Sequence, residues 1–239
     1  MSADASSADL LLAEELLLLV LDDGKGHDKT LGGADSGLAG ALLIELAARG
    51  WLELAAGRLV PTVPPPAVAP AASVLAVALA IIAAEGTPRD AGHWVRKLPG
   101  ELKPIKGSVA ARLVDLGILS PQRRKVLGLV PVDRYPELDP EPERLLRRRL
   151  RAELTGTTDL SSRTAMLIPL LRAYNLVDKL VDRPQRKEAS RLTKAVAEDP
   201  GKVTDAVGSA LNDTQIAVSA AITAAVAASV ASGGGDGSC

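Results

Sequence analysis

The chain has 239 residues, of which 47% are hydrophobic and 24% are charged, which is enough apolar material for a substantial core and excludes a disordered chain. There is no Phe and there are only two Trp and two Tyr, so Leu, Ala and Val must fill that core, and this composition favours helices over strands. A net charge of −1 argues against a surface that is basic all over, as a general binder of nucleic acids or membranes would have, but permits a local basic patch.

Capped and periodic segments predict helices in the first half of the chain. Asp9 and Ser73 are suitable N-caps, Gly50 is a suitable stop, and Pro104 suits a first turn. The predicted ranges are 10–21, 38–49, 73–84, 91–97 and 104–117.

The second half is predicted to be helical as well. In the helix 142–154, Leu146, Leu150 and Leu154 share one face and arginines occupy the other. Three further helices are predicted over 163–181, starting at Ser161 or Ser162, over 185–197 and over 204–232.

Residues 41–61 and 111–131 share one plan: an apolar helix, a glycine stop, a short apolar run, a turn and a second apolar run that ends at proline. We interpret them as two units of a helix plus a hairpin. The predicted fold class is therefore mainly α, a single helical-bundle domain with amphipathic outer helices and one or two short β-hairpins. The domain is expected to span residues 9–231, between a disordered N-terminus (1–8) and a flexible C-terminal tail (232–239).

The segment MSADASSADL lacks the basic region of a signal peptide, and the single cysteine, Cys239, can form no internal disulfide, so a cytoplasmic protein is expected. Residues 67–84 and 215–232 are uncharged and approach the length of a membrane span. Pro70 interrupts the first stretch, and Ala, Ser and Thr dominate the second, so buried helices are predicted instead.

Few side chains suited to catalysis occur in the chain. His27 and His93 are the only histidines, and no spacing typical of a metal site, a phosphate-binding loop or a nucleophile motif is present. Glu14 and Glu15 are neighbours on a helix and point apart, so both are predicted to be surface carboxylates. No enzymatic activity, cofactor or metal is expected.

Two basic groups are candidates for binding. Lys103 and Lys106 lie at the N-cap and third positions of the helix that Pro104 opens, where a cation opposes the helix dipole unless a bound anion reverses the interaction. The alternative is two exposed lysines with no ligand. The second group is the arginine face of residues 144–151, backed by residues 122–125, for which a solvated face balanced by nearby glutamates is the alternative.

A helix that ends at Gly50 before a hairpin is also typical of a winged-helix DNA-binding protein. Residues 36–49 offer almost no polar side chains for base edges, so this helix is predicted to be core. The helix 103–116, with Lys106, Ser108 and Arg112, is the better candidate reader, and nucleic-acid binding is the less favoured interpretation.

The segments LLLAEELLLLVLDDGKG (10–26), SGLAGALLIELAARGWLEL (36–54) and ARLVDLGIL (111–119) follow one another in an order and spacing that resembles the Golgi phosphoprotein 3 family. PERLLRRRLRAEL (142–154) and the segment after Ser162 continue the resemblance, which covers Leu10 to Ser229. The resemblance implies a mostly helical domain with a β-hairpin and no catalytic activity. A bacterial-type member fits the high alanine content.

Eukaryotic members of that family are peripheral membrane proteins that bind phosphatidylinositol 4-phosphate on the cytosolic face of the Golgi and hold the cytoplasmic tails of glycosyltransferases. By resemblance, the lipid head-group residues fall on Leu31, Ala39, Lys103 and Lys106. Only the two lysines keep the charge of the family's arginines, and lysine lacks the bidentate fork of arginine. The segment that matches the family's hairpin, which serves membrane contact or self-association, is RLVPTVPPPAVAPA (58–71).

The sequence thus predicts a non-enzymatic protein, peripheral at the cytosolic membrane face, that binds anionic, phosphoinositide-like head groups. The partners expected are an anionic membrane lipid, the cytoplasmic tails of membrane enzymes and, through the hairpin, a second copy of the chain. The alternatives are an adaptor that binds only protein, its lipid pocket degenerate, and a winged-helix-like DNA-binding protein.

Overall fold

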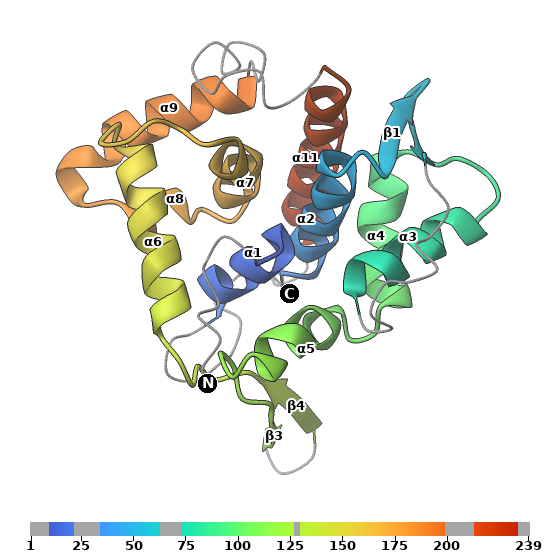
Figure 1. Ribbon diagram of the computed structural model, residues 1–239, viewed down its shortest axis with the longest axis horizontal. Coiled ribbons are helices and arrows are strands. Elements are labelled where there is room, and N and C mark those ends of the chain that lie inside the picture. The colour runs from blue at the N-terminus through green and yellow to red at the C-terminus, as the bar shows by residue number, and fades with distance from the viewer. Residues whose placement is uncertain (1–9, 22–33, 63–72, 127–129, 199–212, 234–239) are drawn as a thin grey trace, which may run out of the picture.

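The computed structural model describes residues 10–21, 34–62, 73–126, 130–198 and 213–233 (Figure 1). The predictions for the N-terminus (1–8), for Leu31 and for the tail beyond residue 233 lie outside these ranges.

Helices dominate the described chain, as the sequence predicts, with ends that differ by a few residues. Their bounds are α1 Leu12–Val20, α2 Asp35–Ala48, α3 Val74–Ala84, α4 Ala91–Glu101, α5 Ile105–Asp115, α6 Glu141–Leu154, α7 Ser162–Ala173, α8 Val177–Leu180, a 3₁₀ turn Arg183–Gln185, α9 Arg186–Glu198 and α11 Asp213–Gly233. The predicted helix 163–181 is two helices, because the chain turns at Asn175, whose φ is +52°. Of the helix predicted over 204–232, residues 204–212 lie outside the described chain.

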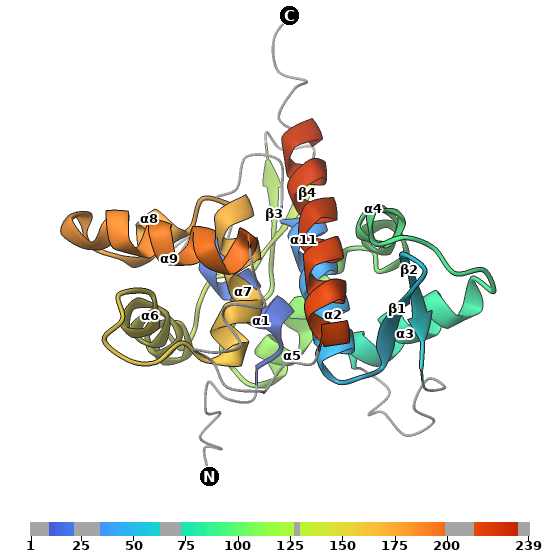
Figure 2. The same cartoon turned by 90° about the horizontal axis from the view of Figure 1, so that it is seen from above.

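Helix α2 is the centre of the molecule. Every residue from Gly37 to Ala47 is buried, because the segment carries only small and aliphatic side chains and one acid, Glu45. Figures 1 and 2 show α11 running beside α2, with α3 and α4 on one side and α6, α8 and α9 on the other. The buried hydrophobic residues, from Leu10 to Val226, form one cluster, which is the core of a single mainly helical domain.

Small residues let α2 approach its neighbours closely. A Cβ atom at Gly37 would lie 2.4 Å from the Tyr174 ring, and one at Gly40 would lie 2.5 Å from Cγ2 of Val226 in α11. The Gly37 amide donates to the Tyr174 hydroxyl at 2.8 Å, so the ring occupies the space that the glycine leaves. Leu146, Leu150 and Leu154 are fully buried, which confirms the predicted apolar face of α6.

Both predicted hairpins are present. Strands β1 (Leu52–Ala55) and β2 (Arg58–Pro61) pair in antiparallel fashion around Ala56 and Gly57, which both have positive φ, as a two-residue type I′ turn requires. Strands β3 (Gln122–Val126) and β4 (Val130–Arg134) form the second hairpin.

The strand positions predicted for the second hairpin are wrong. The short apolar run Ile118–Leu119 was expected to be its first strand, but both side chains are 1% exposed and belong to the core. The strand is instead the polar segment from Gln122 to Val126, because burial of the apolar run leaves the next residues to form the ladder. Of the segment 58–71, residues 58–61 form β2 and residues 63–71 lie outside the described chain.

Among the residues that the structure describes, no helix combines the length and the apolarity needed to cross a bilayer.

Candidate functional site

The N-terminus of α5 carries the two predicted lysines. Pro104 is the N-cap and Ile105 the first helical residue, so Lys103 precedes the cap and Lys106 is the second residue of the helix, one position earlier than predicted. Ile105 is 1% exposed and anchors this turn in the core, which leaves Lys103 on the surface and Lys106 partly buried. The positive end of the α5 dipole therefore carries two lysines within its first residues.

Lys106 faces the start of α2. Its Nζ atom lies 3.9 Å from Oδ1 of Asp35, the first residue of that helix, and the Asp35 side chain is 55% exposed. The ends of two helices thus meet at this point, and both ends carry positive helix dipole. The Asp35 carboxylate places one negative charge at this point.

Ala39 lies one turn after Asp35 on the same side of α2. Ala39 is fully buried and presents nothing to solvent. The fourth predicted residue, Leu31, lies outside the described chain, and whether these positions bind a ligand stays a prediction.

Tyr135, which follows β4, packs against the first turn of α5. A Cβ atom at Gly107 would lie 3.0 Å from the Tyr135 hydroxyl oxygen, so the glycine makes room for it. Burial, with a smaller contribution from Asp133, raises the pKa of Tyr135 above its usual value of 10.0. The phenol is therefore a neutral O–H donor at the margin of the lysine pair.

Sequence reasoning missed two residues of this site. Asp35 precedes Ala39 by one helical turn. Helical periodicity, extended back one residue from the segment 36–54, would therefore have placed Asp35 on the same side of the helix as Ala39. Tyr135 follows a hairpin, and only the tertiary fold brings it to α5.

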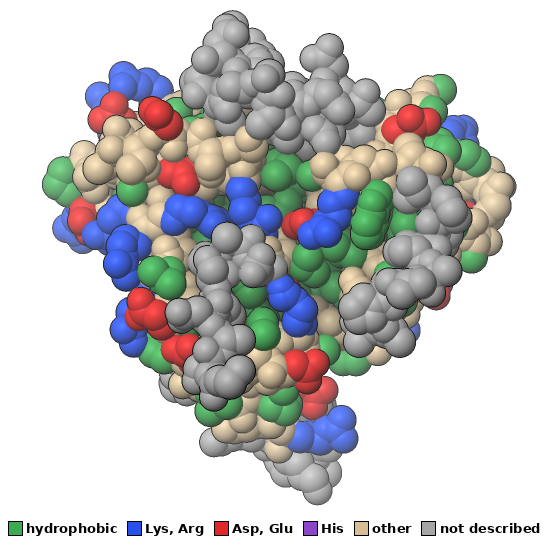
Figure 3. All heavy atoms as spheres, viewed as in Figure 1, with side chains coloured by type: hydrophobic (Ala, Val, Ile, Leu, Met, Phe, Trp, Pro, Cys, Tyr) green, Lys and Arg blue, Asp and Glu red, His purple; other side chains and the backbone are tan. Residues whose placement is uncertain are grey.

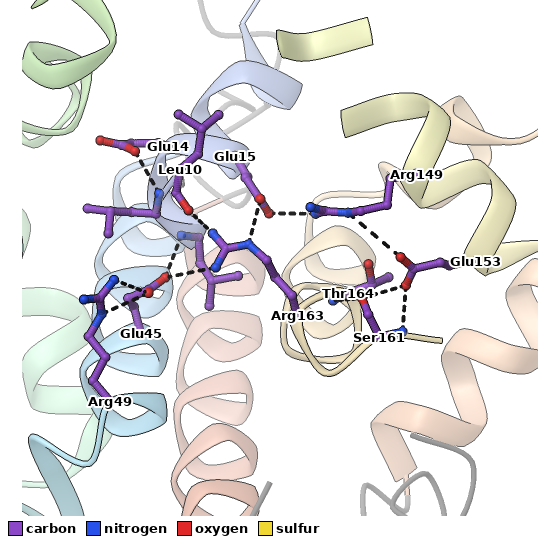
Figure 4. A network of polar contacts seen from close by, with 12 residues as sticks. Leu10, Glu14, Glu15, Glu45, Arg49, Arg149, Glu153, Ser161, Arg163 and Thr164 are labelled. Carbon is purple, nitrogen blue, oxygen red and sulfur yellow. Dashed lines mark hydrogen bonds and ion pairs between the residues drawn. The ribbon is translucent and has the colours of Figure 1, made fainter. Parts of the chain in front are cut away.

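Glu14 and Glu15 were predicted to be surface carboxylates, and this is wrong, because they are 1% and 0% exposed. The two side chains do point apart. Glu15 accepts from Arg163 at 2.8 Å and from Arg149 at 3.0 Å (Figure 4). The Oε1 atom of Glu14 lies 3.3 Å from Nε of Arg112.

The network continues to α2 and to the start of α7. Glu45 accepts from the Leu12 amide at 2.9 Å and forms an ion pair with Arg49 at 2.9 Å. Glu153 accepts from the Ser161 amide and hydroxyl, both at 2.8 Å, and the Ser161 hydroxyl accepts in turn from the Thr164 amide as the N-cap of α7 (Figure 4). These carboxylates satisfy buried backbone donors and join helices, which is a structural role.

The arginines of α6 form the second predicted basic group. Arg144 and Arg148 both reach Glu141, at 3.1 Å and 3.6 Å, and Arg151 reaches Asp182 at 3.2 Å. Figure 3 shows Lys and Arg side chains gathered on the side of the molecule that α6, α8 and α9 form. The residues 122–125, predicted to back this face, form part of strand β3.

The described histidine is not part of a metal site. His93 lies on α4 with Nε2 3.9 Å from Glu85 and its ring edge-on to Trp94, and His27 lies outside the described chain. Over the described ranges, no group of three or more His, Cys, Asp or Glu side chains is arranged to hold a metal ion.

The fold and this site define a class: a mainly helical, single-domain protein with two short hairpins and a basic cluster where two helix N-termini meet. The model of one family, Golgi phosphoprotein 3 (GPP34), matches residues 12–228. The chain belongs to the Golgi phosphoprotein 3 family, which confirms the resemblance seen in the sequence.

Proposed function

We propose that this protein is a non-enzymatic, peripheral membrane protein that binds anionic lipid head groups at the N-terminus of α5. The observation that carries the proposal is the position of Lys103 and Lys106 at the start of α5, where the helix dipole is positive. Two cations oppose the helix dipole there at a cost on the order of 0.3–1 kcal/mol each, and a phosphate would convert that repulsion into attraction.

By family membership, the head group proposed is phosphoinositide-like, with phosphatidylinositol 4-phosphate as the first lipid to test. The membrane face proposed is cytosolic, and the further partners proposed are the cytoplasmic tails of membrane enzymes and, through a hairpin, a second copy of the chain. Lysine contributes a point charge and not a planar fork, so attraction to general negative charge is expected to exceed selectivity for one phosphoinositide.

Vesicle flotation tests the proposal. The probes are vesicles of phosphatidylcholine alone, of phosphatidylcholine with phosphatidylserine, and of phosphatidylcholine with phosphatidylinositol 4-phosphate. The protein should float with both anionic vesicles and not with the neutral one, and added salt should release it, because exposed charges are screened.

The variant Lys103→Glu with Lys106→Glu should lose flotation on both anionic vesicles. The matched control is Lys187→Glu with Lys194→Glu, which makes the same change of charge at exposed positions of α9, far from α5 in Figure 1. Unchanged flotation of the first variant, or equal loss in the control, contradicts the lysine site.

A second candidate function is an adaptor that binds only protein. The buried Ala39 and the Asp35 carboxylate beside Lys106 favour it, because both reduce the positive charge available to a lipid. Failure of the wild-type protein to float with any anionic vesicle, together with retention of a membrane-enzyme tail on the immobilised protein, would support this function instead.

A further inference from the structure

The surface between α6 and α8 is hollowed into a cleft of about 260 Å³. Four arginines of α6 line it together with two residues of α8, and these residues are Arg144, Arg147, Arg148, Arg151, Lys179 and Leu180. The volume suits a small molecule, and this cleft lies on a different side of the molecule from α5 (Figure 1).

The spacing of the arginines matches an elongated anion. At 100° per residue, all four lie within an arc of roughly 100° on one side of α6. From Arg144 to Arg151 the row extends roughly 10 Å along the helix axis, which is longer than a single phosphate group. Lys179 faces this row from the other wall, since α8 packs beside α6.

The acids near the cleft leave an excess of positive charge. The lining groups hold five cations, and the carboxylates that pair with them, over the described chain, are Glu141, Glu143 and Asp182. Glu141 serves two arginines at once, so its charge is shared between them. An excess of two positive charges therefore remains in the space of one small-molecule site.

The pairs differ in how easily a ligand could replace them. Glu143 is buried and fixes Arg147, and the Leu180 carbonyl accepts from Nε of Arg151 at 3.2 Å, so both guanidinium groups are held at the cleft. Glu141 and Asp182 are 50% and 66% exposed, and ion pairs this exposed contribute little. The outward donors of the arginines can thus turn to a phosphate with little loss.

We propose that this cleft binds a phosphorylated anion that carries two or more phosphate groups, each phosphate meeting arginines of successive turns of α6. Arginine suits this chemistry because its planar donors pair with two phosphate oxygens at once. The site goes beyond the lysine pair of α5 and shares no residue with it. The same chemistry is available from a soluble polyphosphorylated molecule and from the head group of a phosphoinositide.

Titration calorimetry with inorganic tripolyphosphate at low ionic strength tests the cleft. The wild-type protein should bind one tripolyphosphate, and Arg144→Gln with Arg148→Gln should weaken binding by roughly twentyfold, since each lost charge near a phosphate is worth about a factor of five in water. The matched control is Arg123→Gln with Arg191→Gln. Arg191 pairs with Glu188 at i,i+3 as Arg144 does with Glu141, and both control residues are exposed and outside the cleft.

The inference is overturned if wild-type protein gives no heat of binding with tripolyphosphate or if the control weakens binding as much as the cleft variant. Lys103→Glu with Lys106→Glu should leave the tripolyphosphate titration unchanged. The calorimetry therefore tests phosphate binding in the cleft independently of lipid binding at α5. Flotation on phosphatidylinositol 4-phosphate vesicles identifies the source: loss of flotation in the cleft variant assigns the phosphates to a lipid, and retained flotation assigns them to a soluble ligand.

Discussion

Glu15 of α1 has no exposed surface and receives donors from two other helices, Arg149 of α6 and Arg163 of α7. Glu15→Gln keeps the size of the side chain but leaves both guanidinium groups without this carboxylate. Removal of one member of a buried ion pair typically costs 3–5 kcal/mol, and we expect about 3 kcal/mol here because each arginine is 24% exposed and can gain water. Urea unfolding followed by circular dichroism measures the change.

The control for this prediction is Glu188→Gln, which removes a carboxylate that is 66% exposed and pairs with Arg191. Its free energy of unfolding should change by less than about 0.5 kcal/mol. Equal effects of the two variants would show that the buried network stabilises the fold no more than a surface pair does.

Glu14 gives the molecule a pH dependence of its own. Burial raises the pKa of its carboxyl above the ordinary value of 4.5, Glu45 adds to the rise, and the Leu11 amide, Arg112 and Arg163 oppose it. Below pH 4.5 the carboxyl is protonated in both states. As the pH rises from 4.5 through the raised pKa, the unfolded state releases the proton first, so this group lowers the stability of the fold progressively.

Glu14→Gln should remove that contribution. The free energy of unfolding of the variant should therefore increase relative to that of the wild type between pH 4.5 and neutral pH, which means that the variant becomes relatively more stable. Chemical unfolding at both pH values measures the difference, and a difference that does not change with pH contradicts the assignment.

Asp35 limits the affinity of the proposed lipid site. Its carboxylate lies 3.9 Å from the Lys106 ammonium, so it competes with an external phosphate for the same charge. Asp35→Asn should strengthen binding to anionic vesicles by about fivefold, because one unit charge near an exposed cation is worth about 1 kcal/mol in water. Flotation over a series of lipid concentrations measures it. A control at Glu188→Gln, which removes an exposed carboxylate of α9 outside both proposed sites, should have no effect, and weaker binding of Asp35→Asn would exclude competition between the Asp35 carboxylate and the lipid.

At the scale of elements, the contact between α2 and α11 depends on Gly40. Gly40→Ala would place a methyl group 2.5 Å from Val226, so α11 must shift, at a cost of about 1–3 kcal/mol that exceeds the gain of up to about 1 kcal/mol in helix propensity. Gly100→Ala in α4 is the matched control, because nothing lies within 4 Å of its added Cβ and the propensity gain should remain. Thermal unfolding should therefore move in opposite directions for the two variants, and a shift in the same direction contradicts the close packing of α2 and α11.

At the scale of the whole molecule, sequence patterns predicted what depends on local chemistry. The apolar stripe of Leu146, Leu150 and Leu154 correctly predicted which face of α6 is buried. The apolar runs on either side of Ala56 and Gly57 correctly predicted the first hairpin. The class, the helix order and the family followed from such signals.

The remaining features depend on contacts between distant segments, and sequence could not provide them. Glu15 resembles any surface glutamate until Arg149 and Arg163, more than a hundred residues away, meet it in the core. The first strand of the second hairpin consists of polar residues because Ile118 and Leu119 are buried in the core, and this burial depends on tertiary packing. At the candidate site, the lysines were visible as a pattern, whereas the approach of Asp35 and Tyr135 to α5 is set by packing.

The pairing of α2 with α11 also determines when the fold can be completed during synthesis. Helix α2 is synthesised long before α11, yet Ser36 forms a hydrogen bond with Ser229 at 2.8 Å, a partner 193 positions later. Until α11 has been synthesised, the side of α2 that carries Gly40 lacks its native contacts with Ile222 and Val226. Contacts of such long range form late, and a nascent chain that lacks them exposes apolar surface. The apolar surface of α2 is therefore made early in translation and is fully buried only once α11 has formed.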